Sequence, residues 1–234
     1  MKYARIETEA GVFEGEYDDG SVHTDEGTYE PEEYELLTPC EPSVLYCIGK
    51  NYDETIDQMG YETPEDPTFF IKPPVSLHNP EESIPYPSFS SEVTYAGELA
   101  AVIDTECKSV GEDEVDDVVR GYTIVNDLDC LDQECLAARK SFDSSGPFGP
   151  VIADIEPVGI EMETHINGEL RQQDNTENML IKPREIISWL SERLTLKPGD
   201  VISFGSPANP GLIEPGDEIE IYYEGIGTLR NTVE

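Results

Sequence analysis

The sequence predicts an α+β fold that is mostly β-sheet, with many short strands and few helices. Apolar runs rich in β-branched residues recur along the chain, turns containing Gly, Pro or Asp separate them, and few segments have the apolar spacing of a helix. A chain of 234 residues is long enough for one large domain, or for one domain with a small appendage.

The first part of the chain, residues 1–42, is predicted to be a small N-terminal β domain. Apolar and polar positions alternate there between Gly and Asp turns, which is typical of short half-buried strands. The apolar positions are Tyr3, Ile6, Val12, Phe13 and Val22. The acidic, proline-containing stretch 30–42 is the expected linker to a second domain, residues 43–234.

The second part begins with core strands. Apolar β-rich runs at 43–52, 98–104 and 121–127 predict buried strands, and the alternation in EIEIYYE (218–224) predicts a strand with one buried face. The buried face of that strand is expected to present Ile219, Ile221 and Tyr223.

Two segments predict helices. Residues 53–60 form a short one that ends at Gly60. Residues 183–194 form the clearest one, with Pro183 in its first turn and an apolar stripe along one face. The stripe consists of Ile186, Ile187, Leu190 and Leu194.

Acidic residues dominate the charge, because 51 Asp and Glu stand against 14 Lys and Arg and give a formal net charge of −37. They are spread along the chain among recognisable strands, which favours a salt-adapted globular protein, as expected from a halophile, over a disordered acidic one. A chain with this few basic residues cannot neutralise a run of phosphates. Nucleic acid is therefore excluded as a partner. Anionic membranes are disfavoured for the same reason.

The chain is predicted to be cytoplasmic. The N-terminus has no apolar signal segment, and no stretch approaches 18 consecutive apolar residues. Five cysteines without CxxC spacing argue against a disulfide framework. Cys130 and Cys135 are interpreted as packing residues, with a soft-metal thiolate site as the less favoured alternative.

Ordered motifs extend from about residue 43 to residue 234. They are IGKNYDETIDQMG (48–60), PTFFIKPP (67–74), YAGELAAVI (95–103), GYTIVNDLDCLDQ (121–133), RKSFDSSGPFGP (139–150), INGELRQQDNTENML (166–180), LTLKPGDVISFGSP (194–207) and PGDEIEIYYEGIGTLRNTV (215–233). In this order and spacing they make the chain resemble the fumarylacetoacetate hydrolase superfamily. The resemblance implies a mixed β-sandwich roll with few short helices, and a homodimer.

The resemblance also implies a metal site. In that superfamily a divalent metal is held by a Glu-x-Glu pair on one strand and by an Asp at the end of another. Glu98 matches the second Glu and Asp127 the Asp, while Ala96 stands at the first position. Mg²⁺ or Mn²⁺, which accept few protein carboxylates, would be held weakly by two. The alternative is that both are surface carboxylates of an acidic protein.

Two further residues have two interpretations each. Asp129 would replace the missing ligand if the strand continued past Asp127, but the favoured prediction makes it the N-cap of a helix with Asp132 at the third position. His78 would be a substitute base at the pocket rim, although a lone loop histidine is more often solvated.

The expected proton-transfer groups are replaced. Thr55 and Gln58 stand where the superfamily has a His and a Glu, and neither titrates near neutrality. Both are predicted to keep a catalytic role by orienting a water through hydrogen bonds. Leu131 stands where the superfamily has an Arg that would grip a carboxylate.

Other expected site residues are present. Lys140 matches the catalytic lysine that reaches the metal-bound substrate and stabilises an enolate. Lys72 has weaker support as a substrate contact. Gly205-Ser206-Pro207 resembles the superfamily's Gly-Thr-Pro loop, which takes a substrate carboxylate. Tyr52 and Phe70 are predicted either to line the pocket or to belong to the core.

Two functional hypotheses follow. The first is an enzyme that acts on a small 2-oxo acid of the acylpyruvate type through Mg²⁺ or Mn²⁺. Decarboxylation or keto–enol tautomerisation is favoured over hydrolysis, because these reactions need enolate stabilisation more than an activated hydroxide. The second is a catalytically silent relative that serves as a binding or partner subunit, because fold alone does not establish activity.

Overall fold

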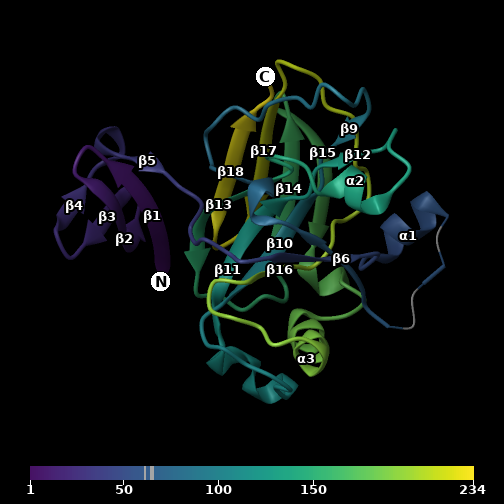
Figure 1. Ribbon diagram of the computed structural model, residues 1–234, viewed down its shortest axis with the longest axis horizontal. Helices are drawn as coiled ribbons and strands as arrows, with labels where there is room; N and C mark the ends of the chain where they lie inside the picture. Colours follow the sequence, from purple (N-terminus) through teal and green to yellow (C-terminus); the bar gives the residue numbers. More distant parts are fainter. Residues whose placement is uncertain (61, 64–65) are drawn as a thin grey trace.

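The computed structural model of the protein describes residues 1–60, 62–63 and 66–234. Figure 1 shows a body of β-sheet with few helices around it and the N-terminal strands β1–β5 projecting to one side. The prediction of an α+β fold that is mostly β-sheet is confirmed. Among the described residues, no helix has both the length and the apolar character needed to cross a bilayer.

A large sheet forms the frame of the molecule. Among the described residues it has 12 strands in the order β4-β3-β2-β1-β13-β11-β10-β16-β6-β7, with β5 beside β1 and β8 beside β13. The strands are β1 Lys2–Thr8, β2 Gly11–Asp18, β3 Ser21–Thr24, β4 Gly27–Tyr29, β5 Glu35–Leu36, β6 Leu45–Gly49, β7 Thr68–Lys72, β8 Leu77–His78, β10 Gly97–Ile103, β11 Val119–Asn126, β13 Gly146–Ala153 and β16 Val201–Ser203.

Two smaller sheets complete the β-structure of the described chain. One has the strand order β15-β14-β17-β18, and the other is the short pair β12-β9. Their bounds are β9 Val93–Thr94, β12 Asp129–Cys130, β14 Glu161–Ile166, β15 Glu169–Asn175, β17 Glu218–Tyr223 and β18 Gly227–Thr232. In β17 the predicted face of Ile219, Ile221 and Tyr223 is buried.

Strand β10 lies at the centre and is buried along its whole length. Successive side chains of a strand point to opposite faces. Leu99 and Ala101 therefore pack with Met162 and Ile221 of the four-stranded sheet. Ala100 and Val102 belong to a second apolar cluster, which lies on the other face. The strand has a packed layer on each side, so residues on it are held rigidly.

The helices are short and sit at the edges of the sheets (Figure 1). They are α1 Asp53–Met59, α2 Leu136–Lys140 and α3 Pro183–Arg193, with 3₁₀ turns η1 Pro31–Glu33, η2 Pro74–Ser76, η3 Glu112–Asp117 and η4 Thr176–Asn178. Helix α1 ends at Gly60 in the left-handed conformation, with φ 65°, as predicted. Helix α3 begins with Pro183 and buries Ile186, Ile187 and Leu190, also as predicted.

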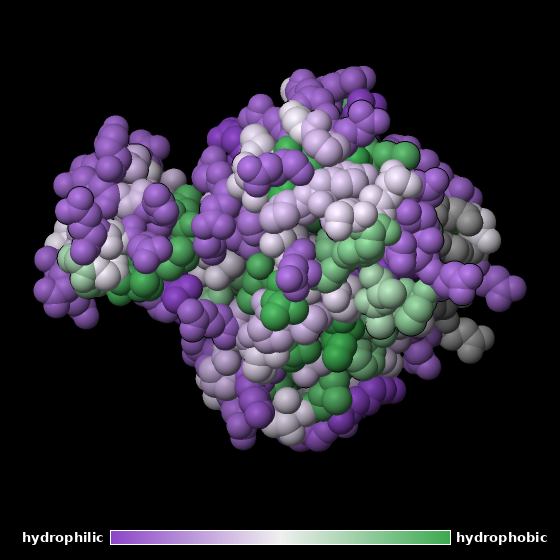
Figure 2. All heavy atoms as spheres, turned by 45° about the horizontal axis from the view of Figure 1, so that its top comes forward, coloured by the Kyte–Doolittle hydropathy of each residue, from purple (hydrophilic) through white to green (hydrophobic). Residues whose placement is uncertain are grey.

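The N-terminal strands extend the large sheet. Strand β1 pairs on one edge with β2 and on the other with β13, where Lys2 lies opposite Ala153. The expected linker, residues 30–42, contains η1 and β5. That residues 1–42 fold as a domain of their own stays a prediction. Figure 2 shows hydrophilic side chains over most of these strands and apolar patches nearer the middle of the body.

Candidate active site

Two buried carboxylates from neighbouring strands form the centre of the site. Glu98 is in β10, and Asp127 directly follows β11, which is antiparallel to β10. The Asp127 N–H donates to the main-chain oxygen of Ala96 at 2.9 Å, so the two strands stay paired to this point. By strand periodicity Glu98 shares a face with Ala100, and Asp127 shares a face with Val125. Glu98 and Asp127 are each only 3% exposed, so neither is a surface carboxylate.

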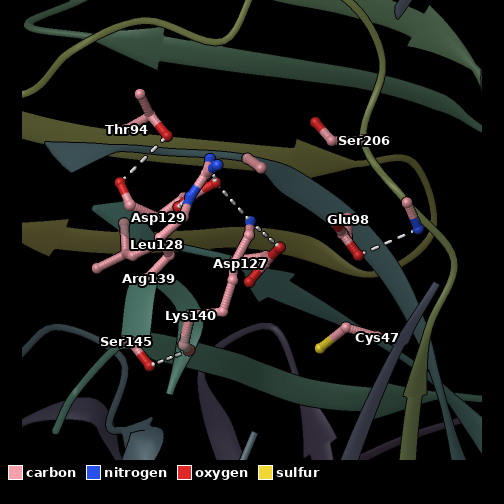
Figure 3. A network of polar contacts seen from close by, with 12 residues as sticks. Cys47, Thr94, Glu98, Asp127, Leu128, Asp129, Arg139, Lys140, Ser145 and Ser206 are labelled. Carbon is pink, nitrogen blue, oxygen red and sulfur yellow. Dashed lines mark hydrogen bonds and ion pairs between the residues drawn. The ribbon is translucent and has the colours of Figure 1, made fainter. Parts of the chain in front are cut away.

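Two lysines neutralise Asp127, and Figure 3 shows one of them, Lys140, beside it. Lys140 Nζ donates to Oδ2 at 2.5 Å, and Lys72 Nζ lies 3.0 Å from Oδ1. Burial alone would raise the pKa of Asp127, but these two ammonium groups outweigh burial and lower it. Burial would lower the pKa of Lys140, but Asp127 and then Asp129 outweigh it and raise it. The site therefore holds an ionised carboxylate against a permanently charged ammonium.

Lys72 is the most deeply buried charge of the site. Its side chain is 0% exposed. Its Nζ donates to the main-chain oxygens of Leu128, Lys140 and Ser145, and also to Ser145 Oγ. These contacts tie three segments of main chain to Asp127. A direct contact between Lys72 and substrate stays a prediction.

Glu98 is held in an unfavourable environment for a negative charge. Burial, and then repulsion from Asp127, raise its pKa to about 8. Its Oε2 accepts one hydrogen bond from the Gly205 N–H at 3.1 Å. A cation placed next to Glu98 and Asp127 would favour the ionised form of both.

The residues present fit a hard divalent cation with few protein ligands. Carboxylate oxygens suit Mg²⁺ and Mn²⁺, and Mg²⁺ commonly keeps several waters. Asp127 Oδ1 is buried and accepts no hydrogen bond of regular geometry, although Lys72 is close. Among the residues the structure describes, no group of three or more His, Cys, Asp or Glu side chains is arranged to hold a metal. Glu98 and Asp127 would thus be the two protein ligands.

The prediction that Asp129 caps a helix is wrong. Asp129 lies in β12, paired with Thr94, and helix α2 begins at Leu136. Its carboxylate accepts two hydrogen bonds from Arg139, from Nε at 2.8 Å and from Nη2 at 2.6 Å. A two-pronged charged contact and strand pairing outweigh the local capping preference. Asp132, expected at the third helical position, instead accepts from Ser90 Oγ and the Ser91 N–H.

Thr55 and Gln58 connect helix α1 to the loop after β16. Thr55 Oγ1 donates to the main-chain oxygen of Ser206 at 3.0 Å. Gln58 and Asn209 form two bonds, in which the Asn209 N–H donates to Gln58 Oε1 at 2.8 Å and Gln58 Nε2 donates to Asn209 Oδ1 at 3.2 Å. Both side chains therefore contact the loop that contains Gly205-Ser206-Pro207. Orientation of a water by either stays a prediction.

The Gly205–Pro207 loop passes directly beside Glu98. Gly205 has φ 88°, and a Cβ there would lie 3.1 Å from Asn51 Cβ and 3.3 Å from the Ile48 oxygen, so a larger residue would be strained. Ser206 Oγ accepts from Gln172 Nε2 at 3.0 Å and donates to the Pro207 oxygen at 3.3 Å.

Gln172 is a site residue that sequence reasoning missed. It is 0% exposed, and its Nε2 also donates to the main-chain oxygens of Pro207 and Ala208 at 2.9 and 3.2 Å. Its Oε1 accepts from the Gly97 N–H at 3.3 Å. Gln172 thus joins the loop to the start of β10. The sequence carries no clear signal for it, because its strand, ELRQQDN, does not alternate apolar and polar residues.

Tyr52 and Phe70 occupy different places. Tyr52 is 1% exposed and lines a pocket of about 520 Å³ beside Asp174. The Phe70 ring is partly buried, with its centroid 5.4 Å from Lys140 Nζ, close enough for a cation–π contact. Leu131 is 40% exposed and contributes no charge.

The remaining histidine and cysteine candidates lie elsewhere or are buried. His78 lines a second pocket, of about 510 Å³, together with Arg5 and Glu41. Cys130 is buried in β12, and Cys135 is exposed at the start of α2. Cys47 lies near Glu98 and Asp127 in Figure 3, and burial raises the pKa of its thiol well above the ordinary value. Sequence reasoning gave Cys47 no role.

Known proteins share both the sequence pattern and the fold. A family model described as fumarylacetoacetate (FAA) hydrolase, C-terminal, matches residues 44–234. Oxaloacetate tautomerase YisK of Bacillus subtilis is 35% identical over 207 residues, which cover 81% of this chain and 69% of that protein.

Two solved structures are similar along most of the chain. The 5-carboxymethyl-2-hydroxymuconate delta-isomerase of Mycobacterium smegmatis is 35% identical, with a TM-score of 0.92, and the match covers 100% of this chain and 98% of that one. The fumarylpyruvate hydrolase of Pseudomonas aeruginosa, solved with Mn²⁺ and pyruvate, is 25% identical, with a TM-score of 0.77 and coverage of 86% and 91%.

Proposed function

Because the chain belongs to the fumarylacetoacetate hydrolase family, we propose that it is an enzyme for keto–enol tautomerisation or decarboxylation of a small 2-oxo acid of the acylpyruvate type. The observation that carries the proposal is the Lys140 ammonium, whose side chain is only 12% exposed and which lies 2.5 Å from Asp127. Both reactions pass through an enolate, and a fixed positive charge near the reacting oxygen stabilises it. The relatives named as a tautomerase and as an isomerase support this reaction class.

A divalent cation, Mg²⁺ or Mn²⁺, would be held by Glu98 and Asp127. When bound, it would polarise the oxygens of the 2-oxo acid as a Lewis acid. The Mn²⁺ in the related fumarylpyruvate hydrolase supports the choice of metal. With Ala96 offering only a methyl group, the site would bind the cation weakly.

The chain's own residues have separate tasks in this proposal. Lys140 supplies the charge that favours the enolate. Lys72 holds Asp127 in place through its contacts to three main-chain oxygens. Ser206 and the main chain of its loop are suited to a substrate carboxylate, and Gln172 fixes that loop. Hydrolysis is disfavoured, because Thr55 and Gln58 cannot act as a general base.

The second candidate is a catalytically silent protein that binds a small molecule or a partner. It is favoured by one observation: both Asp127 oxygens face ammonium groups, which a cation must displace or share. The two candidates differ in a simple way, because only the enzyme turns over substrate.

Turnover is best measured on oxaloacetate, by enol absorbance for tautomerisation and by pyruvate release for decarboxylation, with Mn²⁺ in molar KCl. The high salt follows from the proposal that the strongly acidic chain is salt-adapted. Lys140→Gln should lower turnover roughly 10²- to 10³-fold. Lys197→Gln, at an exposed lysine, is the matched control and should leave turnover unchanged. A folded protein that binds Mn²⁺ but turns over neither oxaloacetate nor acylpyruvates would favour the silent candidate.

A further inference from the structure

Five charged side chains of alternating sign form a continuous row through the site. Arg139 grips both oxygens of Asp129, and Asp129 Oδ2 lies 3.4 Å from Lys140 Nζ. Lys140 donates to Asp127 at 2.5 Å, and Asp127 contacts Lys72 at 3.0 Å. Figure 3 shows Lys140 between the two aspartates, with Arg139 on the far side of Asp129. Lys140 thus has two carboxylates within reach, one close and one farther away.

The proposed cation and the two lysines compete for the oxygens of Asp127. Asp127 is one of the two carboxylates available to the proposed cation, yet Lys140 occupies its Oδ2 and Lys72 lies next to its Oδ1. A divalent cation and an ammonium on the same carboxylate oxygen repel each other strongly in a buried site. If Lys140 had no other partner, it would compete with the cation for Asp127.

We infer that Asp129, held by Arg139, is a positioning residue. When Asp127 binds the divalent cation, Asp129 replaces it as the ion-pair partner of Lys140. The inference rests on the cation site proposed above and adds to it a role for two residues of this chain. The ammonium needs only a small shift, since both carboxylates already flank it. Lys140 stays charged and beside the cation, where the proposed reaction needs it.

The surroundings of Asp129 suit a fixed acceptor. Its main chain is held in β12 by pairing with Thr94 of β9. Its carboxylate is oriented by the two-pronged contact to Arg139, a geometry that guanidinium provides and an ammonium cannot. Arg139 and Lys140 are consecutive residues in the last turn of α2, so one short helix presents both cations to Asp129. The Asp129 side chain is 11% exposed, which limits screening by salt.

The test is a double-mutant cycle on Mn²⁺ affinity, measured by electron spin resonance in molar KCl. Asp129→Asn should weaken Mn²⁺ binding about fivefold or more, because Lys140 then remains on Asp127. Asp132→Asn is the matched control, since Asp132 is bonded to Ser90 and Ser91 instead, and it should change affinity less than about twofold. In a Lys140→Gln background, Asp129→Asn should also change affinity less than about twofold, because no ammonium is left to compete.

Each outcome decides the inference. An equal loss in the Lys140→Gln background would show that Asp129 acts on the cation through its charge alone, and would overturn the inference. Unchanged affinity in Asp129→Asn would overturn it too, while leaving the cation site standing. A folded wild-type protein that binds no Mn²⁺ would overturn both proposals.

Arg139 variants provide a second route if Asp129→Asn does not fold, as judged by circular dichroism and thermal unfolding. Arg139→Gln keeps the Asp129 carboxylate but removes its clamp, so affinity should fall, and Arg139→Lys should restore it only in part. Affinity that Arg139→Gln leaves unchanged would overturn the role of Arg139.

Discussion

The two sides of the candidate site differ in the kind of group that they offer. The strand side, from β10 and β11, presents ionisable groups that are largely shielded from water: Glu98, Asp127 and the lysine pair on Asp127. The helix side, from α1, presents a hydroxyl and an amide, Thr55 and Gln58, and both are bonded to the loop after β16. The strand side is charged, and the helix side offers neutral groups that hold the loop by hydrogen bonds.

The difference indicates which side can supply catalytic groups. Groups that bind a cation or stabilise an enolate need charge in a water-poor place, and only the strand side provides it. Hydrogen bonds from α1 instead fix the loop whose Gly205 N–H donates to Glu98. The helix side thus affects the charged side through position, and four changes test this division.

The largest effect is expected from Lys72→Met. The substitution leaves three main-chain oxygens and one side of Asp127 without their buried cation. Loss of one partner of a buried pair costs about 3–5 kcal/mol of unfolding free energy. Urea unfolding in molar KCl measures it, with Lys197→Met as the exposed control. A loss below about 1 kcal/mol would show that Lys72 does not hold Asp127 and the surrounding main chain in place.

The next effect is the pH dependence caused by Glu98. Its folded-state pKa is raised to about 8 from 4.5, so between these values the native state keeps a proton that the unfolded chain has lost. Stability of the cation-free protein should therefore fall as pH rises from about 4.5 to about 8. Glu98→Gln, which carries no titrating group, should lack this part of the fall. Above pH 8 the unfolding free energy of Glu98→Gln should therefore exceed that of the wild type.

Thermal unfolding with a chelator, from pH 5 to pH 9, gives the comparison. If wild type and Glu98→Gln show parallel pH profiles, the pKa of Glu98 is not raised in the folded protein, which would contradict the description of the strand side.

A smaller effect is expected from Ala96→Glu. Ala96 precedes Glu98 by two positions and lies where β10 meets Asp127. A third carboxylate should raise Mn²⁺ affinity about tenfold. Calorimetry measures it, and Ala96→Gln, which has the same length without the charge, is the control. If affinity rises while turnover does not, the neutral helix side limits the reaction. Equal affinity in Ala96→Glu and Ala96→Gln would contradict the proposed position of the cation.

The smallest effect is expected from Gln58→Ala. It removes two hydrogen bonds at an exposed position, so unfolding free energy should fall by about 1 kcal/mol or less. Because the loop then loosens, KM for the substrate should rise more than kcat falls. A loss in kcat with KM unchanged would instead assign Gln58 a direct part in the chemistry, as the sequence predicted.

Much of the fold was predictable because local patterns and tertiary burial agree. The stripe that includes Ile186 and Leu190 marks α3, and the alternation from Glu218 to Tyr223 marks β17. The start of α2 was not predictable in the same way. Asp129 has a strong capping preference, but its contacts to Arg139 and Thr94 depend on pairing that the local sequence does not encode.

Some residues of the candidate site were predictable from the sequence, and others were not. Glu98, Asp127 and Lys140 stand in recognisable motifs, and the structure brings them together around Asp127. Gln172 and Arg139 could not be found, because their importance comes from partners far along the chain or from a strand pair formed on folding.

The most direct test of the proposed cation site is Mn²⁺ binding by the purified protein in molar KCl, measured by electron spin resonance for wild type and Asp127→Ala. Folding of both is checked by thermal unfolding. We expect saturable binding in the wild type, and none in Asp127→Ala. No saturable binding by a folded wild type, or equal binding by the two proteins, would contradict the claim that Glu98 and Asp127 form a cation site.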